Sequence, residues 1–180
     1  MEEKTEAGII GTEEGKAKGG GEGGGGTNQQ QLVVFKLGGE DFGVDIMQVR
    51  EIIRKGDITA VPNAPEFVKG VINLRGQITT IIDLRRKLGL LEKESSEDEH
   101  QERVIVVEVE KNTVGMAVDA VTEVTYLSES DIDEVPSMVK ENIGTEYLRG
   151  VGKLPNKLLI LIDLKRVLHG EELDALRQSA

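Results

Sequence analysis

The sequence predicts a mainly β protein made of two small β-barrel-like subdomains, each followed by a short helix, that pack together as one body. Two observations lead to this fold class. Short runs of β-branched and apolar residues alternate with turn residues along the chain, as in antiparallel β structure. The same order of strand, turn, strand and helix start also occurs twice, which indicates a duplicated β unit.

The internal repeat aligns without gaps. Residues 68–88 fall on residues 148–168 at a shift of 80 positions, and eight of the 21 pairs are identical. Residues 32–52 fall on a later hairpin at a shift of 72. This second shift places Gly43 on Gly115, Val49 on Val121 and Glu51 on Glu123. The approximate repeat units are therefore residues 32–90 and 104–168.

The first third of the chain is predicted to pass from a disordered tail into a β-hairpin. Residues 1–31 hold ten of the 22 glycines and few apolar residues, a composition that cannot bury a core. Order is expected to begin at Leu32, and residues 32–46 predict a β-hairpin with a glycine turn. Residues 47–53 fit either a strand or a short helix, and their pattern does not decide. Residues 58–65 contain two prolines and predict an extended loop.

Residues 68–90 predict a strand, a tight turn, a second strand and the start of a helix capped by Asp83. Gly76 can adopt the positive φ that a tight turn requires, so Arg75 is expected at the tip of the turn. No acidic residue lies within six positions of Arg75. Two interpretations stay open: an arginine available to a binding partner, or an ordinary surface arginine that is solvated or paired with a distant residue.

The second half of the chain repeats this organisation after a polar linker. Residues 92–103 carry six acidic and two basic residues and predict a solvated acidic connector. Residues 104–109 and 114–124 predict strands, and residues 127–142 predict a loop with one helical turn. The second copy of the repeat follows, and residues 171–180 predict a C-terminal helix or tail.

The composition excludes several classes of function. A net charge of −11 with 3% aromatic residues lacks both the positive charge and the stacking rings of a nucleic-acid-binding protein. No apolar run is long enough to span a membrane, and no secretory signal is recognisable, so direct membrane insertion is not expected. The absence of cysteine excludes disulfides and fits a cytoplasmic protein.

The titratable residues do not predict an enzyme. With no cysteine and only two histidines, His100 and His169, the chain lacks the groups for a His-assisted nucleophile or a His-rich metal site. Asp83 and Asp163 occupy equivalent strand-to-helix junctions, which duplicated helix capping explains. We therefore expect no catalytic residue, metal or cofactor, and we interpret the chain as a protein-binding module.

Several ordered motifs between Leu32 and Leu168 resemble CheW-type chemotaxis adaptors: FGVDIMQVREI, VKGVINLRG, IIDLRRKLG, VGMAVDAVTEV, TEYLRGVGKL and LLILIDL. The resemblance implies two intertwined, five-stranded, SH3-like β-barrels around a common hydrophobic centre, in a domain of residues 32–170. It also implies a cytoplasmic adaptor, recruited to membrane-associated arrays, between the chemoreceptor tip and the regulatory domain of the histidine kinase CheA. Many members carry proline where this chain has Thr80, which affects only the expected local strand geometry.

The resemblance further implies a receptor-binding groove between the subdomains. By position, its residues are Val49, Glu51, Gly70, Asn73, Arg75, Gly76, Val121 and Val124. The methyl-accepting chemoreceptor would lay a helical hairpin against the valines, with Arg75 orienting it, while the glycines and Asn73 shape the loop. The alternative interpretation is a scaffold of a related, non-chemotactic receptor–kinase pathway.

Overall fold

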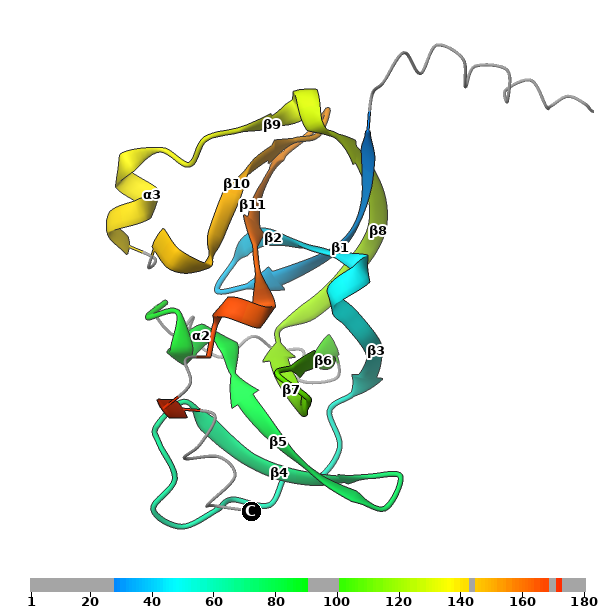
Figure 1. Cartoon of the computed structure of the whole chain (residues 1–180), viewed down its shortest axis with the longest axis vertical. Coiled ribbons are helices and arrows are strands. Elements are labelled where there is room, and N and C mark those ends of the chain that lie inside the picture. Colours follow the sequence, from blue (N-terminus) through cyan, green and yellow to red (C-terminus); the bar gives the residue numbers. More distant parts are fainter. Residues whose placement is uncertain (1–27, 91–100, 143–144, 169–170, 173–180) are drawn as a thin grey trace, which may run out of the picture.

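The computed structural model describes residues 28–90, 101–142, 145–168 and 171–172 of the chain. Within these residues, eleven strands form two mixed sheets joined by short helical turns (Figure 1). The prediction of a mainly β fold is confirmed. Among the described helices, none is long and apolar enough to cross a membrane.

The first repeat unit contributes five of these strands. Its elements are β1 (Gln29–Leu37), β2 (Glu40–Asp45), the 3-10 turn η2 (Ile46–Gln48), β3 (Val49–Arg54), β4 (Val68–Leu74), β5 (Gln77–Asp83) and α2 (Leu84–Lys87). The ambiguous residues 47–53 thus divide into the end of a helical turn and most of a strand. Residues 58–65 form the expected loop, tied to β4 by a bridge between Thr59 and Val71.

The second repeat unit contributes the other six described strands. Its elements are β6 (Arg103–Val109), β7 (Asn112–Val118), β8 (Ala120–Ser128), η4 (Glu129–Asp131), β9 (Ile132–Asp133), α3 (Ser137–Asn142), η5 (Thr145–Tyr147), β10 (Leu148–Lys153), β11 (Leu158–Ile162) and η6 (Leu164–Arg166). Apart from the two-residue β9, the two units therefore present the same order of strands, as the alignment of the sequence with itself predicts.

The sheets do not coincide with the repeat units, because each unit gives its first hairpin to the other. Sheet A has the order β8-β1-β2-β11-β10-β9, and sheet B has the order β3-β6-β7-β5-β4. The β1–β2 hairpin of the first unit therefore lies among strands of the second, and the β6–β7 hairpin lies among strands of the first. The parallel pairs β2–β11 and β5–β7 join the units inside each sheet. Each sheet therefore contains strands of both units, and in this sense the two units are intertwined. The two-residue β9 gives sheet A six strands, one more than the expected five.

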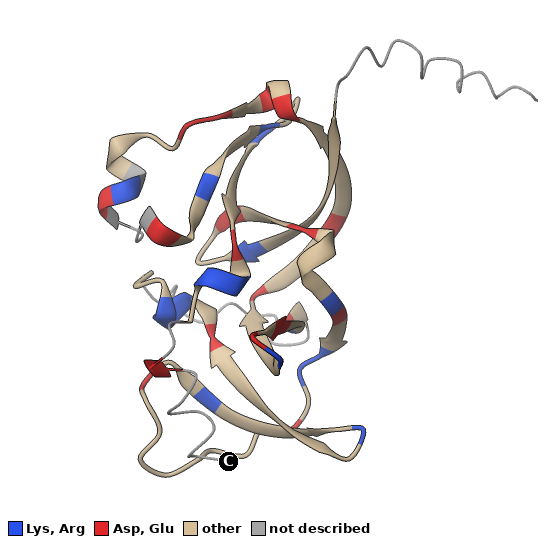
Figure 2. Ribbon diagram, in the orientation of Figure 1, with Lys and Arg blue, Asp and Glu red and all other residues tan. Residues whose placement is uncertain are grey.

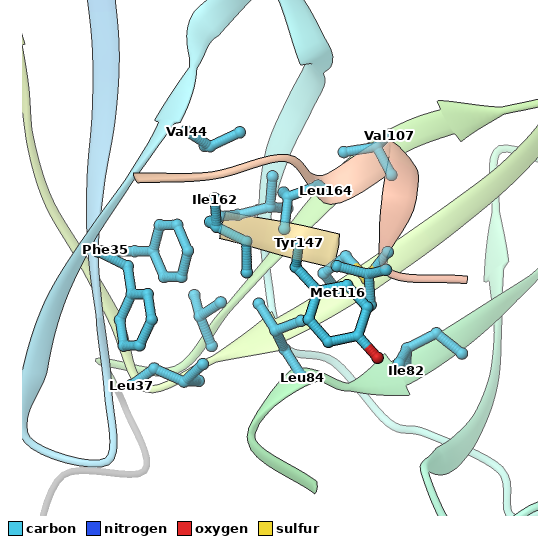
Figure 3. Packing of buried hydrophobic residues seen from close by; sticks show 14 of the residues in the cluster. Phe35, Leu37, Val44, Ile82, Leu84, Val107, Met116, Tyr147, Ile162 and Leu164 are labelled. Atoms are coloured by element: carbon cyan, nitrogen blue, oxygen red, sulfur yellow. The ribbon is translucent and has the colours of Figure 1, made fainter. Parts of the chain in front are cut away.

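Three apolar clusters stabilise this arrangement. Alternate residues of β1 point to opposite faces of sheet A, as the period of two in a strand requires. One face of β1 contributes Val33, Phe35 and Leu37 to a central cluster shared by both sheets. The opposite face contributes Leu32 and Val34 to a second cluster, formed by residues of sheet A. A third cluster lies under sheet B. The central cluster, seen closely in Figure 3, receives residues from both sheets and is the common hydrophobic centre.

Two aspartates cap the helical turns that follow β5 and β11. The Oδ1 atom of Asp83 accepts from the backbone N–H of Arg86 at 3.3 Å, and that of Asp163 accepts from the N–H of Lys165 at 3.0 Å. The predicted capping role of Asp83 and its repetition in the second unit are confirmed. Gln48 of the first unit adds a link between the units, because its Nε2 donates to Oδ1 of Asp163 in the second unit at 2.8 Å.

Three predicted boundaries were wrong by a few residues. Strand β1 begins at Gln29, inside the predicted tail of residues 1–31, because Gln29 to Gln31 pair with β8. Strand β6 begins at Arg103, inside the predicted connector. Strand β8 continues to Ser128, so the predicted loop begins later than residue 127. In each case pairing with a distant strand orders residues whose local composition is that of a loop.

Other predictions fall on residues outside the described part of the chain. These are the tail up to residue 27, the connector from residue 92 to residue 100 with His100, His169, and the C-terminal segment from residue 173 onward. Of the predicted C-terminal helix, the described residues Glu171 and Glu172 are helical.

Tyr147 gives the central cluster a pH dependence that can be measured. It is 8% exposed, and burial, followed by the charges of Glu146 and Glu172, raises the pKa of its hydroxyl above the ordinary 10.0. Because the folded pKa is the higher one, the stabilisation is complete below about pH 10 and is lost as the pH rises through the folded pKa. We expect the melting temperature of the parent chain to fall more steeply above about pH 10 than that of Tyr147→Phe. Parallel curves in thermal unfolding at increasing pH would contradict this.

Candidate functional site

The turn between β4 and β5 presents Arg75 at its tip, as predicted. Arg75 and Gly76 are the two central residues and both have positive φ, 51° and 85°, as a type I′ hairpin turn requires. The Asn73 side chain stabilises the turn, since its Oδ1 accepts a hydrogen bond from the Gly76 N–H at 2.7 Å. Figure 2 shows the basic tip of this hairpin projecting away from the body of sheet B. The Arg75 side chain is 70% exposed.

Arg75 has an acidic partner that is distant in the sequence. Its Nη2 contacts Glu51 Oε2, on strand β3, 24 residues earlier. Of the two interpretations left open by the sequence, the distantly paired arginine is therefore the one observed. Strands β3 and β4 are the opposite edges of sheet B, so the contact forms because the sheet curls and brings its edges together. The ion pair marks the closure of the sheet B barrel.

A depression of about 230 Å³ lies beside this ion pair. It is lined by Arg50, Glu51, Leu74, Arg75, Gln77, Val106 and Thr113. Arg50 reaches it through a β-bulge: Val49 pairs with Val107 and Glu51 with Val106, which leaves Arg50 as the extra residue. A second depression, of about 460 Å³, adjoins it, because Arg50 also lines that one together with Met47, Gln48 and Val49.

The structure gathers most of the predicted site residues at sheet B and two of them at sheet A. The β4–β5 end of sheet B holds Asn73, Arg75 and Gly76, together with Glu51 of β3. Val49 precedes Glu51 on β3, and the β-bulge lies between these two residues. Val121 and Val124 lie on β8 of sheet A. Val49 and Val121 both pack against the central cluster, and Val124 is 49% exposed.

Gly70 is a structural position. It is buried with φ of 150°, and a Cβ atom added there would lie 2.2 Å from the backbone oxygen of Thr59. That close approach allows the bridge between Thr59 and Val71. Gly70 therefore shapes strand β4 and presents no side chain to a partner.

Several exposed residues around the site were missed from the sequence. Met47 is 85% exposed next to Val49, and Tyr126 is 62% exposed two positions beyond Val124. The period of two along β8 was the signal that could have indicated Tyr126. Arg50, Gln77 and Thr113 had no such signal, because the depression they line is created by a bulge and by the curling of the sheet.

The described residues offer no arrangement for metal binding, since they contain no group of three or more His, Asp or Glu side chains able to hold an ion. The site instead combines partly buried valines with an ion-paired arginine on a short, well-defined turn. Such a surface suits recognition of a protein partner, with apolar contacts giving affinity and charged groups giving orientation.

Comparison with known proteins identifies the family. A family model described as the CheW-like domain matches residues 31–172. The chain is 40% identical over 143 residues to the chemotaxis protein CheW of Klebsiella aerogenes, covering 79% of this chain and 84% of that protein. It is 36% identical over 147 residues to the chemotaxis protein CheW of Treponema pallidum, covering 81% and 86%.

A solved structure agrees with these relatives. The crystal structure of the scaffolding protein TtCheW from Thermoanaerobacter tengcongensis matches with a TM-score of 0.71 and 34% identity, covering 83% of this chain and 94% of that chain. The resemblance seen in the sequence motifs is confirmed, and both of these relatives are named chemotaxis proteins. The chain therefore belongs to the CheW-like domain family of chemotaxis coupling adaptors.

Proposed function

We propose that this chain is a non-enzymatic adaptor that couples the cytoplasmic tip of a methyl-accepting chemoreceptor to the regulatory domain of the histidine kinase CheA. The observation that carries the proposal is the Arg75 turn, fixed by Glu51 and Asn73, in a chain of the CheW-like family. The adaptor works in the cytoplasm and is recruited to membrane-associated receptor arrays through its partners.

The receptor contact is a helix laid along a groove. Apolar residues of the receptor's helical hairpin pack on Val49, Val121 and Val124, which line the two edge strands β3 and β8. Arg75 orients the hairpin through a carboxylate or through carbonyl oxygens at a helix end. Glu51 holds Arg75, while Gly70, Asn73 and Gly76 fix the backbone that presents it. The kinase domain binds a separate surface, so that both partners are held together.

A titration tests the bridging role. Isotope-labelled chain is titrated first with a chemoreceptor cytoplasmic-tip fragment and then with the CheA regulatory domain, while the backbone amide shifts are followed. We expect the receptor fragment to shift amides around Val49, Arg75 and Val121, and the kinase domain to shift a separate patch. Absence of any shift with both partners would refute the proposal.

Replacing Arg75 with alanine is expected to lower the affinity for the receptor fragment about tenfold, the usual cost of one hydrogen bond to a charged group. The melting temperature should hardly change, because an ion pair whose arginine is 70% exposed contributes at most about 1 kcal/mol. Arg54→Ala, at an exposed arginine on the far end of β3, is the matched control and should bind normally. Equal affinities for the two variants, or gross unfolding of Arg75→Ala, would count against Arg75 as a receptor contact.

A further inference from the structure

The depression beside Arg75 has the chemistry of a site for one negatively charged side chain. Arg50 and Arg75 stand on its rim with the side chains of Gln77 and Thr113, and Leu74 and buried Val106 form its base. Each guanidinium group has one carboxylate of the chain as partner: Arg75 pairs with Glu51, and Arg50 pairs with Glu108, which lies outside the depression. The attraction for a further carboxylate therefore rests on the N–H donors that these two pairs leave free.

The internal ion pairs of the rim leave donors for a partner. Arg75 meets Glu51 through Nη2, and among the described residues no other acceptor for its five N–H groups is found. Arg50 meets Glu108 at 3.1 Å, but these two side chains are 56% and 52% exposed. Such an exposed pair contributes little and can exchange for a better-placed carboxylate. The Gln77 amide and the Thr113 hydroxyl likewise have no hydrogen-bond partner within the part of the chain that the structure describes.

The internal repeat gives the depression on sheet B an equivalent position on sheet A, where the lining residues differ. At the equivalent position on sheet A, Gln77 is replaced by Lys157 and Thr113 by Asp41. Lys157 Nζ lies 3.7 Å from Glu123, the equivalent of Glu51, and 3.8 Å from Asp41. Lys36 Nζ also lies 3.2 Å from Asp41, and Pro155 stands where sheet B has Arg75. On sheet A the chain's own lysines therefore engage both acids and Lys157 occupies the place, whereas on sheet B Arg75, Gln77 and Thr113 keep donors for a carboxylate from outside.

The size of the depression limits its occupant. Its volume of about 230 Å³ is below the range of about 300 to 1,000 Å³ typical of small-molecule sites. A single side chain with a short apolar stem and a charged end fits, since the stem can lie on Leu74 and the charge can reach both arginines. A glutamate on a helix has this shape.

We propose that the depression between Arg50 and Arg75 receives one glutamate side chain from the chemoreceptor's helical hairpin, and that the equivalent place on sheet A does not. This inference rests on the proposed function and adds the chemistry of the contact. Because the equivalent place on sheet A is closed by Lys157, the glutamate fixes which way round the chain lies along the receptor. The two similar halves of the chain are thereby distinguished by the receptor, which binds in one orientation.

The test introduces into sheet B the lysine and the aspartate that occupy the equivalent positions 157 and 41 on sheet A. The double variant Gln77→Lys with Thr113→Asp places a lysine beside Glu51 and a new acid on the rim. We expect its affinity for the chemoreceptor tip fragment to fall at least about tenfold, while its affinity for the CheA regulatory domain stays at the parent value. The reciprocal variant Lys157→Gln with Asp41→Thr is the matched control and should bind the receptor fragment as the parent does.

A second experiment identifies the carboxylate and does not depend on the folding of the double variant. Each glutamate of the receptor fragment is changed to glutamine in turn and titrated against the parent chain and against Arg50→Gln, a change at an exposed side chain. We expect one glutamate whose loss weakens binding to the parent about tenfold and has little further effect on Arg50→Gln, the signature of a coupled pair.

The outcomes separate this inference from the proposed function. If the parent binds the fragment and neither Gln77→Lys with Thr113→Asp nor Arg50→Gln weakens it, the glutamate site is wrong and the adaptor role stands. If these variants weaken binding to the kinase domain instead, the site belongs to the kinase and the inference is overturned. If the parent binds no receptor fragment at all, the proposed function fails and the inference fails with it.

Discussion

Gly70→Ala is expected to lower the free energy of unfolding by about 3 to 5 kcal/mol, because it combines backbone strain with a collision that cannot relax. The φ of Gly70 is 150°, where side chains are rarely found, and the new Cβ would lie 2.2 Å from the Thr59 backbone oxygen. That oxygen accepts the Val71 N–H at 2.8 Å in the bridge that ties the loop to β4. The loop must therefore move away or the strand must distort.

The matched control is Gly56→Ala. Nothing lies within 4 Å of a Cβ atom added at Gly56, so this change should alter stability by less than about 0.5 kcal/mol. Chemical denaturation of both variants measures the difference. If Gly70→Ala unfolds at the same denaturant concentration as the parent but loses receptor binding, then Gly70 belongs to the binding surface and its structural assignment is wrong.

Phe35→Ala should destabilise the chain by about 3 to 5 kcal/mol, the usual cost of truncating a fully buried phenylalanine. Phe35 on β1 lies directly opposite Phe42 on β2, and the two rings stack at 5.7 Å with an interplanar angle of 17°. Both belong to the central cluster, where Figure 3 shows Phe35 among residues from both sheets. Because the β1–β2 hairpin of the first unit is embedded in sheet A, a cavity there loosens the contact between the two units.

Two further variants make this measurement specific. Phe35→Leu keeps most of the volume and should cost less than Phe35→Ala. Tyr126→Ala changes a residue that is 62% exposed and should leave the denaturation midpoint almost unchanged. A denaturation midpoint of Phe35→Ala equal to that of the parent would show that the central cluster does not hold the sheets together.

Features that depend on neighbouring residues could be predicted from the sequence. Alternating apolar residues predicted the β1–β2 hairpin, glycine at position 76 predicted the turn, and the aspartates predicted the helix caps. The repeat predicted that the two units share one order of strands. The motifs also predicted the family, because they follow one another through most of the range that the family model matches. The hairpin, the turn and the caps were predictable because periodicity, turn chemistry and capping each depend on a few residues that are adjacent in the sequence.

How these elements combine became visible in the folded chain and could not be predicted from the sequence. Nothing local in the sequence specifies that each unit gives its first hairpin to the other, because strand pairing is a choice among distant partners. The meeting of Arg75 with Glu51 follows from the curling of sheet B, and the place of Arg50 follows from a bulge in β3. The repeated sequence predicted two similar units. The folded chain made them unequal, because Lys157 bridges two acids on sheet A while Gln77 leaves the equivalent place on sheet B open.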